Sequence, residues 1–246
     1  MIGPMLGGLL ITTYGLVNGI KLSFGISIFL CLFGLMFQHN IAEVETVRRS
    51  GLHPAALWKK LDKRLKNLLV SDILVRFCEQ IPYVFVVIWC LNYIKVSPGQ
   101  FGILSAVEMM TAALIYIPVA SFSDRLERKP FVAITFIFFA LFPVILYFSG
   151  NYLLLILAFV IRGLKEFGEP TRKAMILDLS VKDAEALTFG LYYFIRDMIV
   201  SVAAFIGGFL WAVSPGLNLF TAAAAGAAGT IYFIFFGRGT ERIVKH

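Results

Sequence analysis

Eight long apolar stretches constrain the fold of this chain more than any other feature of its sequence. They cover residues 2–17, 22–41, 68–94, 100–121, 131–149, 151–179, 186–213 and 217–237, and turn residues or charge clusters separate them. A helix that spans a bilayer needs about 20 mostly apolar residues. Of the 246 residues, 59% are hydrophobic and 15% are charged, whereas soluble domains contain about 45–50% apolar and about 25% charged residues. The sequence therefore predicts an all-α membrane protein with about eight transmembrane helices.

The composition argues against several other classes of protein. Cys31, Cys78 and Cys90 lie in apolar stretches and are odd in number, so a disulfide scaffold is not expected. The sequence contains no phosphate-binding G-x-x-x-x-G-K-[ST] loop, no H-E-x-x-H, no G-x-S-x-G and no paired C-x-x-C. The three histidines are scattered along the chain. We therefore expect no enzyme activity, no cofactor, no metal site and, despite the net charge of +7, no nucleic-acid partner.

The positive charges are distributed unevenly between the loops. Segment 42–67 contains seven Lys and Arg residues, and loop 122–130, loop 170–185 and the tail contain three each. The alternate turns contain only Lys21 and Lys95. Because basic loops stay on the cytoplasmic side of a membrane, the bias predicts a multi-pass protein of the cell (plasma or inner) membrane with both termini in the cytoplasm.

The same pattern divides the chain into four parts. Residues 1–41 contain two helices, residues 42–67 form a basic linker, residues 68–238 form a six-helix bundle, and residues 239–246 form a tail. Within the linker, Leu57, Trp58, Leu61 and Leu65 recur at helical spacing opposite Lys and Arg, so we expect an amphipathic helix on the anionic inner membrane surface. The first helix is about 21 Å long over 2–15, shorter than the bilayer core, which indicates a truncated helix.

Ionisable residues inside the predicted spans are the main candidates for function, because a charge in lipid is costly and must face a polar interior. In helix 151–179 the uncharged part is too short to span, so we expect the helix to continue through Arg162, Lys165, Glu166 and Glu169. These four residues share one face. We expect Arg162 to pair with Glu166, and Lys165 with Glu169, at i,i+4 spacing.

Three further helices carry charges. Asp72, Arg76, Glu79 and Tyr83 share one face of helix 68–94, with Asp72 expected at the membrane interface. Arg196 and Asp197 lie near the middle of helix 186–213, and Glu108 is isolated in 100–121. Excluding Asp72, the spans contain four cations and five acids, and the surplus acid is what a proton-binding site requires. The alternative is that the pairs neutralise one another and only specify helix packing.

Three motifs resemble those of the major facilitator superfamily. Residues 120–129 are similar to its loop signature G-x-x-x-D-R-x-G-R-[KR], with Asp124, Arg125, Arg128 and Lys129 matching and Ala120 and Glu127 replacing both glycines. Gly3, Pro4, Gly7 and Gly8 resemble the end of the G-x-x-x-G-P-x-x-G-G motif of its proton antiporters, and Gly207-Gly208 repeats part of it about 200 residues later. Arg162-Gly163 resembles its buried arginine motif, with altered spacing.

The resemblance implies a major-facilitator-type bundle that lacks its first four helices, so that residues 1–41 are the last two helices of the N-terminal half. A complete transporter of this family passes its solute between two six-helix halves, so the missing helices would be needed for a cavity. The resemblance further implies gating by Asp124, Arg125, Arg128 and Lys129.

We expect a secondary active transporter that exports a small organic solute in exchange for protons by alternating access. The proton carrier is expected to be Glu79 or Glu108. The polar cavity wall is expected to contain Arg76, Tyr83, Arg162, Lys165, Glu166, Glu169, Arg196 and Asp197. Two alternatives stay open: a proton-coupled importer, or a non-transporting truncated membrane protein or scaffold subunit. The expected partners are the lipid bilayer, the solute and protons.

Overall fold

The fold is that of a bundle of long apolar helices. The computed structural model describes residues 2–39, 53–123 and 127–237, and within them it contains helices and no strands. The helices are α1 (Ile2–Tyr14), α2 (Leu16–Gln38), α3 (Pro54–Lys60), α4 (Lys63–Gln80), α5 (Tyr83–Ile88), η1 (Trp89–Tyr93, a π-helix), α6 (Pro98–Ser123), α7 (Arg128–Phe148), α8 (Tyr152–Leu164), α9 (Glu169–Asp178), α10 (Glu185–Val200), α11 (Val202–Val213) and α12 (Pro215–Phe236).

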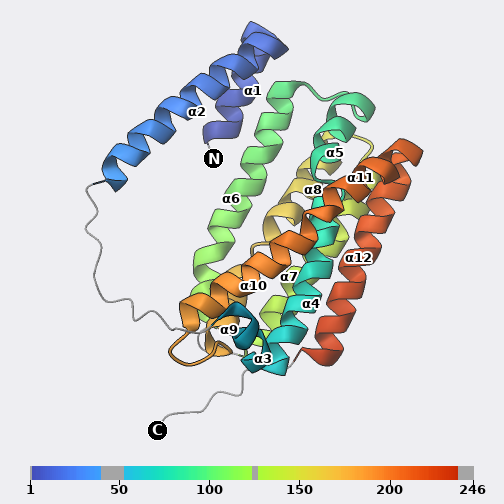
Figure 1. The fold of residues 1–246 in the computed structure, drawn as a ribbon. Coiled ribbons are helices and arrows are strands. Elements are labelled where there is room, and N and C mark those ends of the chain that lie inside the picture. The colour runs from blue at the N-terminus through green and yellow to red at the C-terminus, as the bar shows by residue number, and fades with distance from the viewer. Residues whose placement is uncertain (1, 40–52, 124–126, 238–246) are drawn as a thin grey trace.

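The helix lengths confirm an all-α membrane protein. Six helical segments in the described residues are long and apolar enough to cross a bilayer: Leu16–Gln38, Lys63–Tyr93, Pro98–Tyr116, Arg128–Phe148, Glu185–Val213 and Pro215–Phe236. The other two predicted spans are shorter as helices, because α1 and α8 have 13 residues each. Helices α4, α7 and α12 pack together, α6 and α8 lie beside them, and the α1–α2 hairpin contacts the bundle through α6 (Figure 1).

The predicted continuous helix over 151–179 is wrong. Helix α8 ends at Leu164, turns occupy residues 165–168, and α9 begins at Glu169. Pro170 lies in the first turn of α9, where a missing N–H is tolerated. The backbone N–H of Gly168 donates to Thr135 Oγ1 of α7, so a neighbouring helix satisfies part of the backbone that the break exposes.

The amphipathic segment of the linker packs on protein. Leu57, Leu61 and Leu65 are all buried in the same core cluster as Ile176 and Tyr192. The expectation that this apolar face lies on the membrane surface is therefore wrong, because the bundle itself provides an apolar surface for it.

The junction between α3 and α4 is fixed by a helix cap. Asp62 accepts a hydrogen bond from the backbone N–H of Arg64 at the start of α4. The side-chain hydrogen bond and the charge of Arg64 hold the pKa of the Asp62 carboxyl below its usual value. The cap therefore stays ionised near neutral pH.

A second helix break, between α4 and α5, is held by the packing of α11 and α12. Pro82 lacks an N–H, and the carbonyl oxygen of Ile81 accepts a hydrogen bond from Nδ2 of Asn218 at 3.3 Å. Asn218 Nδ2 also donates to the carbonyl oxygen of Gly207 at 2.9 Å, and the Asn218 side chain is fully buried. Gly207 lies so close to Ile81 that a Cβ atom there would overlap its carbonyl oxygen.

We expect Gly207→Ala to lower the stability of the protein by about 1–3 kcal/mol, the range for an overpacked site. The added methyl group must push α11 away from the carbonyl of Ile81. Thermal unfolding in detergent measures the effect. Gly208→Ala is the matched control, because a Cβ atom at Gly208 meets nothing within 4 Å. Equal unfolding temperatures for the two variants would contradict the packing described here.

Candidate functional site

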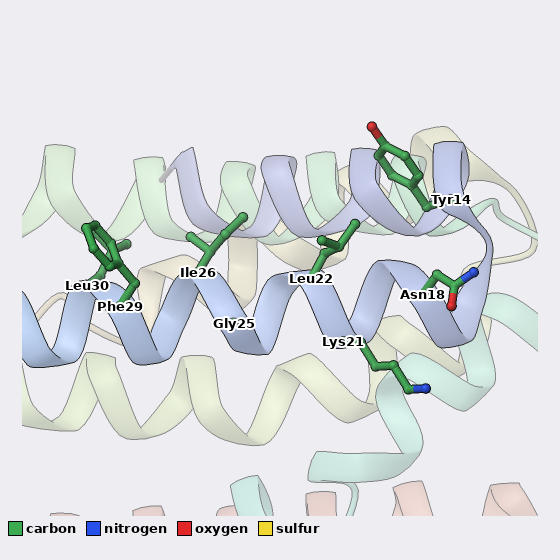
Figure 2. A pocket seen from close by; sticks show the side chains of 8 residues that line it. All are labelled: Tyr14, Asn18, Lys21, Leu22, Gly25, Ile26, Phe29 and Leu30. Atoms are coloured by element: carbon green, nitrogen blue, oxygen red, sulfur yellow. The ribbon is translucent and has the colours of Figure 1, made fainter.

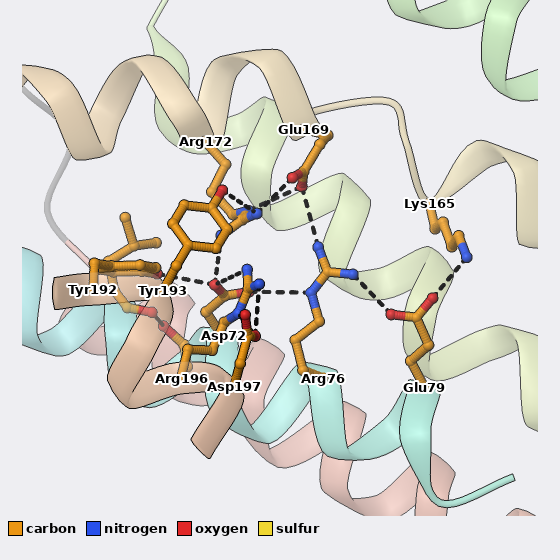
Figure 3. A network of polar contacts seen from close by, with 12 residues as sticks. Asp72, Arg76, Glu79, Lys165, Glu169, Arg172, Tyr192, Tyr193, Arg196 and Asp197 are labelled. Carbon is orange, nitrogen blue, oxygen red and sulfur yellow. Dashed lines mark hydrogen bonds and ion pairs between the residues drawn. The ribbon is translucent and has the colours of Figure 1, made fainter. Parts of the chain in front are cut away.

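Charged residues from α4, α6, α8 with the turn after it, α9 and α10 meet in one buried network, shown in part in Figure 3. Its first centre is Asp72 of α4, whose side chain is 1% exposed. Asp72 Oδ2 lies 2.5 Å from Arg172 Nη1 of α9 and 3.5 Å from Arg196 Nη1 of α10, and it accepts a hydrogen bond from the Tyr192 hydroxyl at 3.0 Å. One carboxylate therefore joins three helices.

Arg172 is the best-satisfied cation of the network. Its side chain is 1% exposed, and Nη2 lies 2.5 Å from Glu169 Oε1 and donates to the Tyr193 hydroxyl at 3.2 Å. Tyr193 also lies against Arg196, whose guanidinium carbon is 4.1 Å from the ring centroid. Burial of the charges of Asp72 and Arg172 is tolerable because each of these two groups has several partners.

The second centre is Glu79 of α4, which joins this helix to the turn that follows α8. Glu79 lies 2.7 Å from Arg76 Nη1 and 2.7 Å from Lys165 Nζ. Lys165 also lies 3.4 Å from Glu108 of α6, which in turn lies 3.3 Å from Arg162 Nε of α8. One ammonium group is therefore shared between carboxylates on two helices.

Arg76 connects the two centres. Besides Glu79, its guanidinium lies 3.4 Å from Glu169 and 3.7 Å from Asp72. Arg76 and Lys165 also lie over the ring of Phe139, and Arg162 lies over Phe142, at 5.1 to 5.9 Å from the centroids. Aromatic rings of α7 thus make cation–π contacts with these three cations.

Most of the site residues predicted from sequence come together in this network. Arg76, Glu79, Glu108, Arg162, Lys165, Glu169 and Arg196 all form ion pairs within it. Asp197 pairs with Arg196 at 2.7 Å but is 61% exposed at its edge. Tyr83 is 54% exposed and makes no hydrogen bond to the network within the described residues. Glu166 is partly buried and forms no ion pair in the described part of the chain.

The pairing within the network differs from the expectation. The predicted pairs Arg162–Glu166 and Lys165–Glu169 are wrong, because the helix breaks after Leu164 and the cations turn to other helices. Arg162 and Lys165 pair with Glu108 and Glu79 instead.

Sequence reasoning missed two central residues. Asp72 was expected at the interface, and Arg172 was counted among the basic residues of a cytoplasmic loop, but both side chains are 1% exposed and pair with each other. A signal for Asp72 was present in its spacing from Arg76 and Glu79 on one helix face. Nothing in the sequence near Arg172 indicated its partner, which is 100 residues away.

Comparison with known proteins identifies the family. Residues 68–245 match the sequence profile of the Major Facilitator Superfamily. The chain belongs to the Major Facilitator Superfamily. It is also 25% identical, over 167 residues, to a protein of Methanocaldococcus jannaschii named as an uncharacterized MFS-type transporter. That alignment covers 65% of this chain and 42% of the relative, so the chain matches less than half of the relative's length.

The major facilitator loop signature is only partly described. Asp124 and Arg125 lie outside the described residues. Arg128 forms an ion pair with Asp178 at the end of α9, and Lys129 Nζ donates to the carbonyl oxygen of Ile234 in α12 at 2.8 Å. These two residues therefore tie the start of α7 to two neighbouring helices.

The glycines of the antiporter-like motif differ in their surroundings. A Cβ atom at Gly8 would lie 2.8 Å from the carbonyl oxygen of Pro98, and one at Gly102 would lie 2.6 Å from that of Pro4. Gly3 and Gly7 have open space. Gly8 therefore allows α1 to approach α6 closely, whereas Gly3 and Gly7 have no such role in the described residues.

An open groove of this major facilitator chain lies away from the charged network. It is a groove of about 740 Å³ between α1 and α2. It is lined by Tyr14, Asn18, Lys21, Leu22, Gly25, Ile26, Phe29 and Leu30 (Figure 2). Its lining is mostly apolar, and its exposed leucine and phenylalanine side chains are what a lipid-facing surface requires. The network, with its charges, is the better candidate site.

Proposed function

We propose that the protein acts as a proton-coupled exporter of a small organic solute that works by alternating access. Its family supports a membrane transporter in general. The observation that supports proton coupling is the sharing of Lys165 between Glu79 and Glu108. When one of these carboxylates takes up a proton, Lys165 pairs only with the other. The ion pair between Lys165 and the helix of the protonated carboxylate is then lost. The export direction rests on the glycine-proline motif around Gly3, Pro4, Gly7 and Gly8.

Of the two carboxylates, Glu108 is the better proton carrier. Its ion pairs with Arg162 and Lys165 measure 3.3 and 3.4 Å, whereas Glu79 accepts hydrogen bonds from two cations at 2.7 Å each. Shorter charge-assisted hydrogen bonds are the stronger ones, so neutralising Glu108 costs less. Its protonation releases α6 from α8 while α4 stays bound to Lys165.

We expect Glu108→Gln to abolish the dependence of export on the proton gradient. The amide mimics a permanently protonated carboxyl, so export no longer responds to external pH. The measurement is solute efflux at two external pH values from cells that carry the gene in its native genomic context. Glu185→Gln, an exposed carboxylate in the first turn of α10, is the control. Unchanged pH-dependent export in both Glu79→Gln and Glu108→Gln would exclude this mechanism.

A further inference from the structure

A pocket lies where α4 begins and α12 ends, away from the charged network. It has a volume of about 390 Å³ and is lined by Asp62, Lys63, Arg64, Asn67, Phe235 and Phe236. This volume lies within the range of about 300–1,000 Å³ that is typical of sites for small molecules. The two helix ends meet at one end of the bundle (Figure 1), where Asn67 Nδ2 donates to the carbonyl oxygen of Phe236 at 3.1 Å. Two segments far apart in the sequence therefore form the pocket together.

The surroundings of this pocket are positively charged. Its lining contains two cations and one acid. The acid, Asp62, lies 2.9 Å from Nη2 of Arg64, so one of the two cations compensates it. The other cation, Lys63, is exposed and forms no ion pair within the described residues. The adjoining end of α3 adds the exposed side chains of Lys59 and Lys60. The charge that remains is positive and calls for an anion.

The other polar groups of the lining already have partners. Asp62 accepts a hydrogen bond from the backbone N–H of Arg64 and so caps α4. The Asn67 amide donates to the carbonyl oxygen of Phe236, and its oxygen accepts a hydrogen bond from the Tyr232 hydroxyl at 3.4 Å. A ligand of this pocket is therefore held by the ammonium group of Lys63 and the positive charge around it, and less by the amide or the helix cap.

The apolar side of the pocket continues along a membrane helix. Phe235 and Phe236 are exposed, and so is Ile231, one turn earlier in α12. Ile231 and Phe235 are four residues apart and share one helix face. Helix α12 is long and apolar enough to cross a bilayer, so this face leads from the pocket toward the apolar core of the membrane. A free phosphate ion does not use such a surface, whereas the acyl chain of a lipid covers it.

We propose that this pocket binds the phosphate group of an anionic phospholipid, with one acyl chain of the lipid lying along Ile231 and Phe235 of α12. Lys63 donates charge-assisted hydrogen bonds to the phosphate oxygens, and basic pockets between membrane helices are suited to such headgroups. A zwitterionic lipid binds less well, because it also brings a quaternary ammonium group to a cationic surface. The bound lipid joins the start of α4 to the end of α12 beside the hydrogen bond of Asn67 and stabilises their contact.

The experiment counts the lipids bound to the whole chain by native mass spectrometry in a neutral detergent. The probes are dioleoylphosphatidylglycerol, which is anionic, and dioleoylphosphatidylcholine, which is zwitterionic. We expect the anionic lipid to bind more tightly. Lys63→Gln should weaken its binding about fivefold, the value of one basic residue at an anionic lipid surface, and Lys63→Arg should bind like the unmodified chain. Lys182→Gln is the matched control, because Lys182 is exposed between α9 and α10 and does not line the pocket.

A second measurement locates the lipid without any substitution. A phosphatidylglycerol that carries a diazirine next to its headgroup should cross-link to peptides that contain residues 63–67 and 235–236. Cross-links confined to other peptides would overturn the proposal, and so would equal affinity for the two lipids. Equal losses in Lys63→Gln and Lys182→Gln would mean that the lipid is only attracted to a basic surface. If Lys63→Gln does not fold, the cross-links and the lipid preference of the unmodified chain decide.

Inorganic phosphate separates a lipid site from a simple phosphate site. If phosphate at the concentration of the lipid displaces it, the pocket binds phosphate and the acyl chain contributes nothing, which contradicts the proposal. The outcome is independent of the proposed proton coupling, because Glu79, Glu108 and Lys165 do not line this pocket. Failure to bind lipid would therefore leave the transport mechanism to its own test.

Discussion

Replacing Arg172 with methionine should strongly lower the stability of the protein, because its buried side chain pairs with two carboxylates. We expect a loss of about 3–5 kcal/mol, the cost of removing one partner of a buried ion pair. Asp72 is 1% exposed and loses its partner at 2.5 Å, and Glu169 loses its own partner at 2.5 Å. Methionine fills a similar volume, so the effect reports charge rather than a cavity. Reversible unfolding in mixed detergent micelles measures it.

The neighbouring lysine provides a control for Arg172. Lys173 is 44% exposed and lies 3.9 Å from Glu169, so Lys173→Met should change stability by less than about 1 kcal/mol. The double variant Asp72→Asn/Arg172→Met should be less destabilised than the sum of the two single variants, because neither partner of the Asp72–Arg172 pair is then left as a charge without the other. Equal effects of Arg172→Met and Lys173→Met would show that the Asp72 pair contributes little.

The membrane helices could be predicted because the sequence pattern that marks such a helix lies within the helix itself. A run of about 20 apolar residues reports a membrane helix from its length alone, as for α2, α7 and α12. The break between α8 and α9 was missed because the charges at Arg162, Lys165, Glu166 and Glu169 matched one helix face. Gly168 and Pro170 were the stronger signals there, since proline is favoured at the start of a helix and not in its interior.

The sequence indicated which charged residues lie inside the bundle, but not which of them pair. Charges within apolar helices must find polar partners, and Arg76, Glu79, Glu108 and Lys165, which this argument singled out, form ion pairs with one another. The same argument does not predict which residues pair, because the pairing depends on which helices are neighbours in the fold.

The sequence also did not indicate that the segments flanking the spans are buried. Arg172 appears in a stretch rich in charge that is typical of a cytoplasmic loop, yet α9 packs it against α4. Leu57 and Leu65 form an apolar face that suits a membrane surface or a protein surface equally well, and only the packing of α3 and α4 decides between them. Both errors concern long-range contacts that no local pattern records.

The largest effect on transport is expected from Lys165. Lys165→Gln removes the ammonium group that Glu79 and Glu108 share, so neither carboxylate can exchange it for a proton. We expect proton-driven efflux to fall about tenfold or more, since each 1.4 kcal/mol of lost coupling is a factor of ten. Efflux at two external pH values, in cells that carry the gene in its native genomic context, measures the change. Lys182→Gln, outside the network, is the control.

A second substitution separates a coupling role of Lys165 from a structural one. Lys165→Gln removes one positive charge from the network, and adding Glu108→Gln removes one negative charge from the same place. Because Glu79 keeps Arg76 and Glu108 no longer carries a charge, the double variant should recover the stability lost in Lys165→Gln but not the response to pH. If stability and pH response both recover, Lys165 only holds the helices together, and the proton must be carried elsewhere. If neither recovers, the sharing of Lys165 between the two carboxylates is not what links α4 to α6.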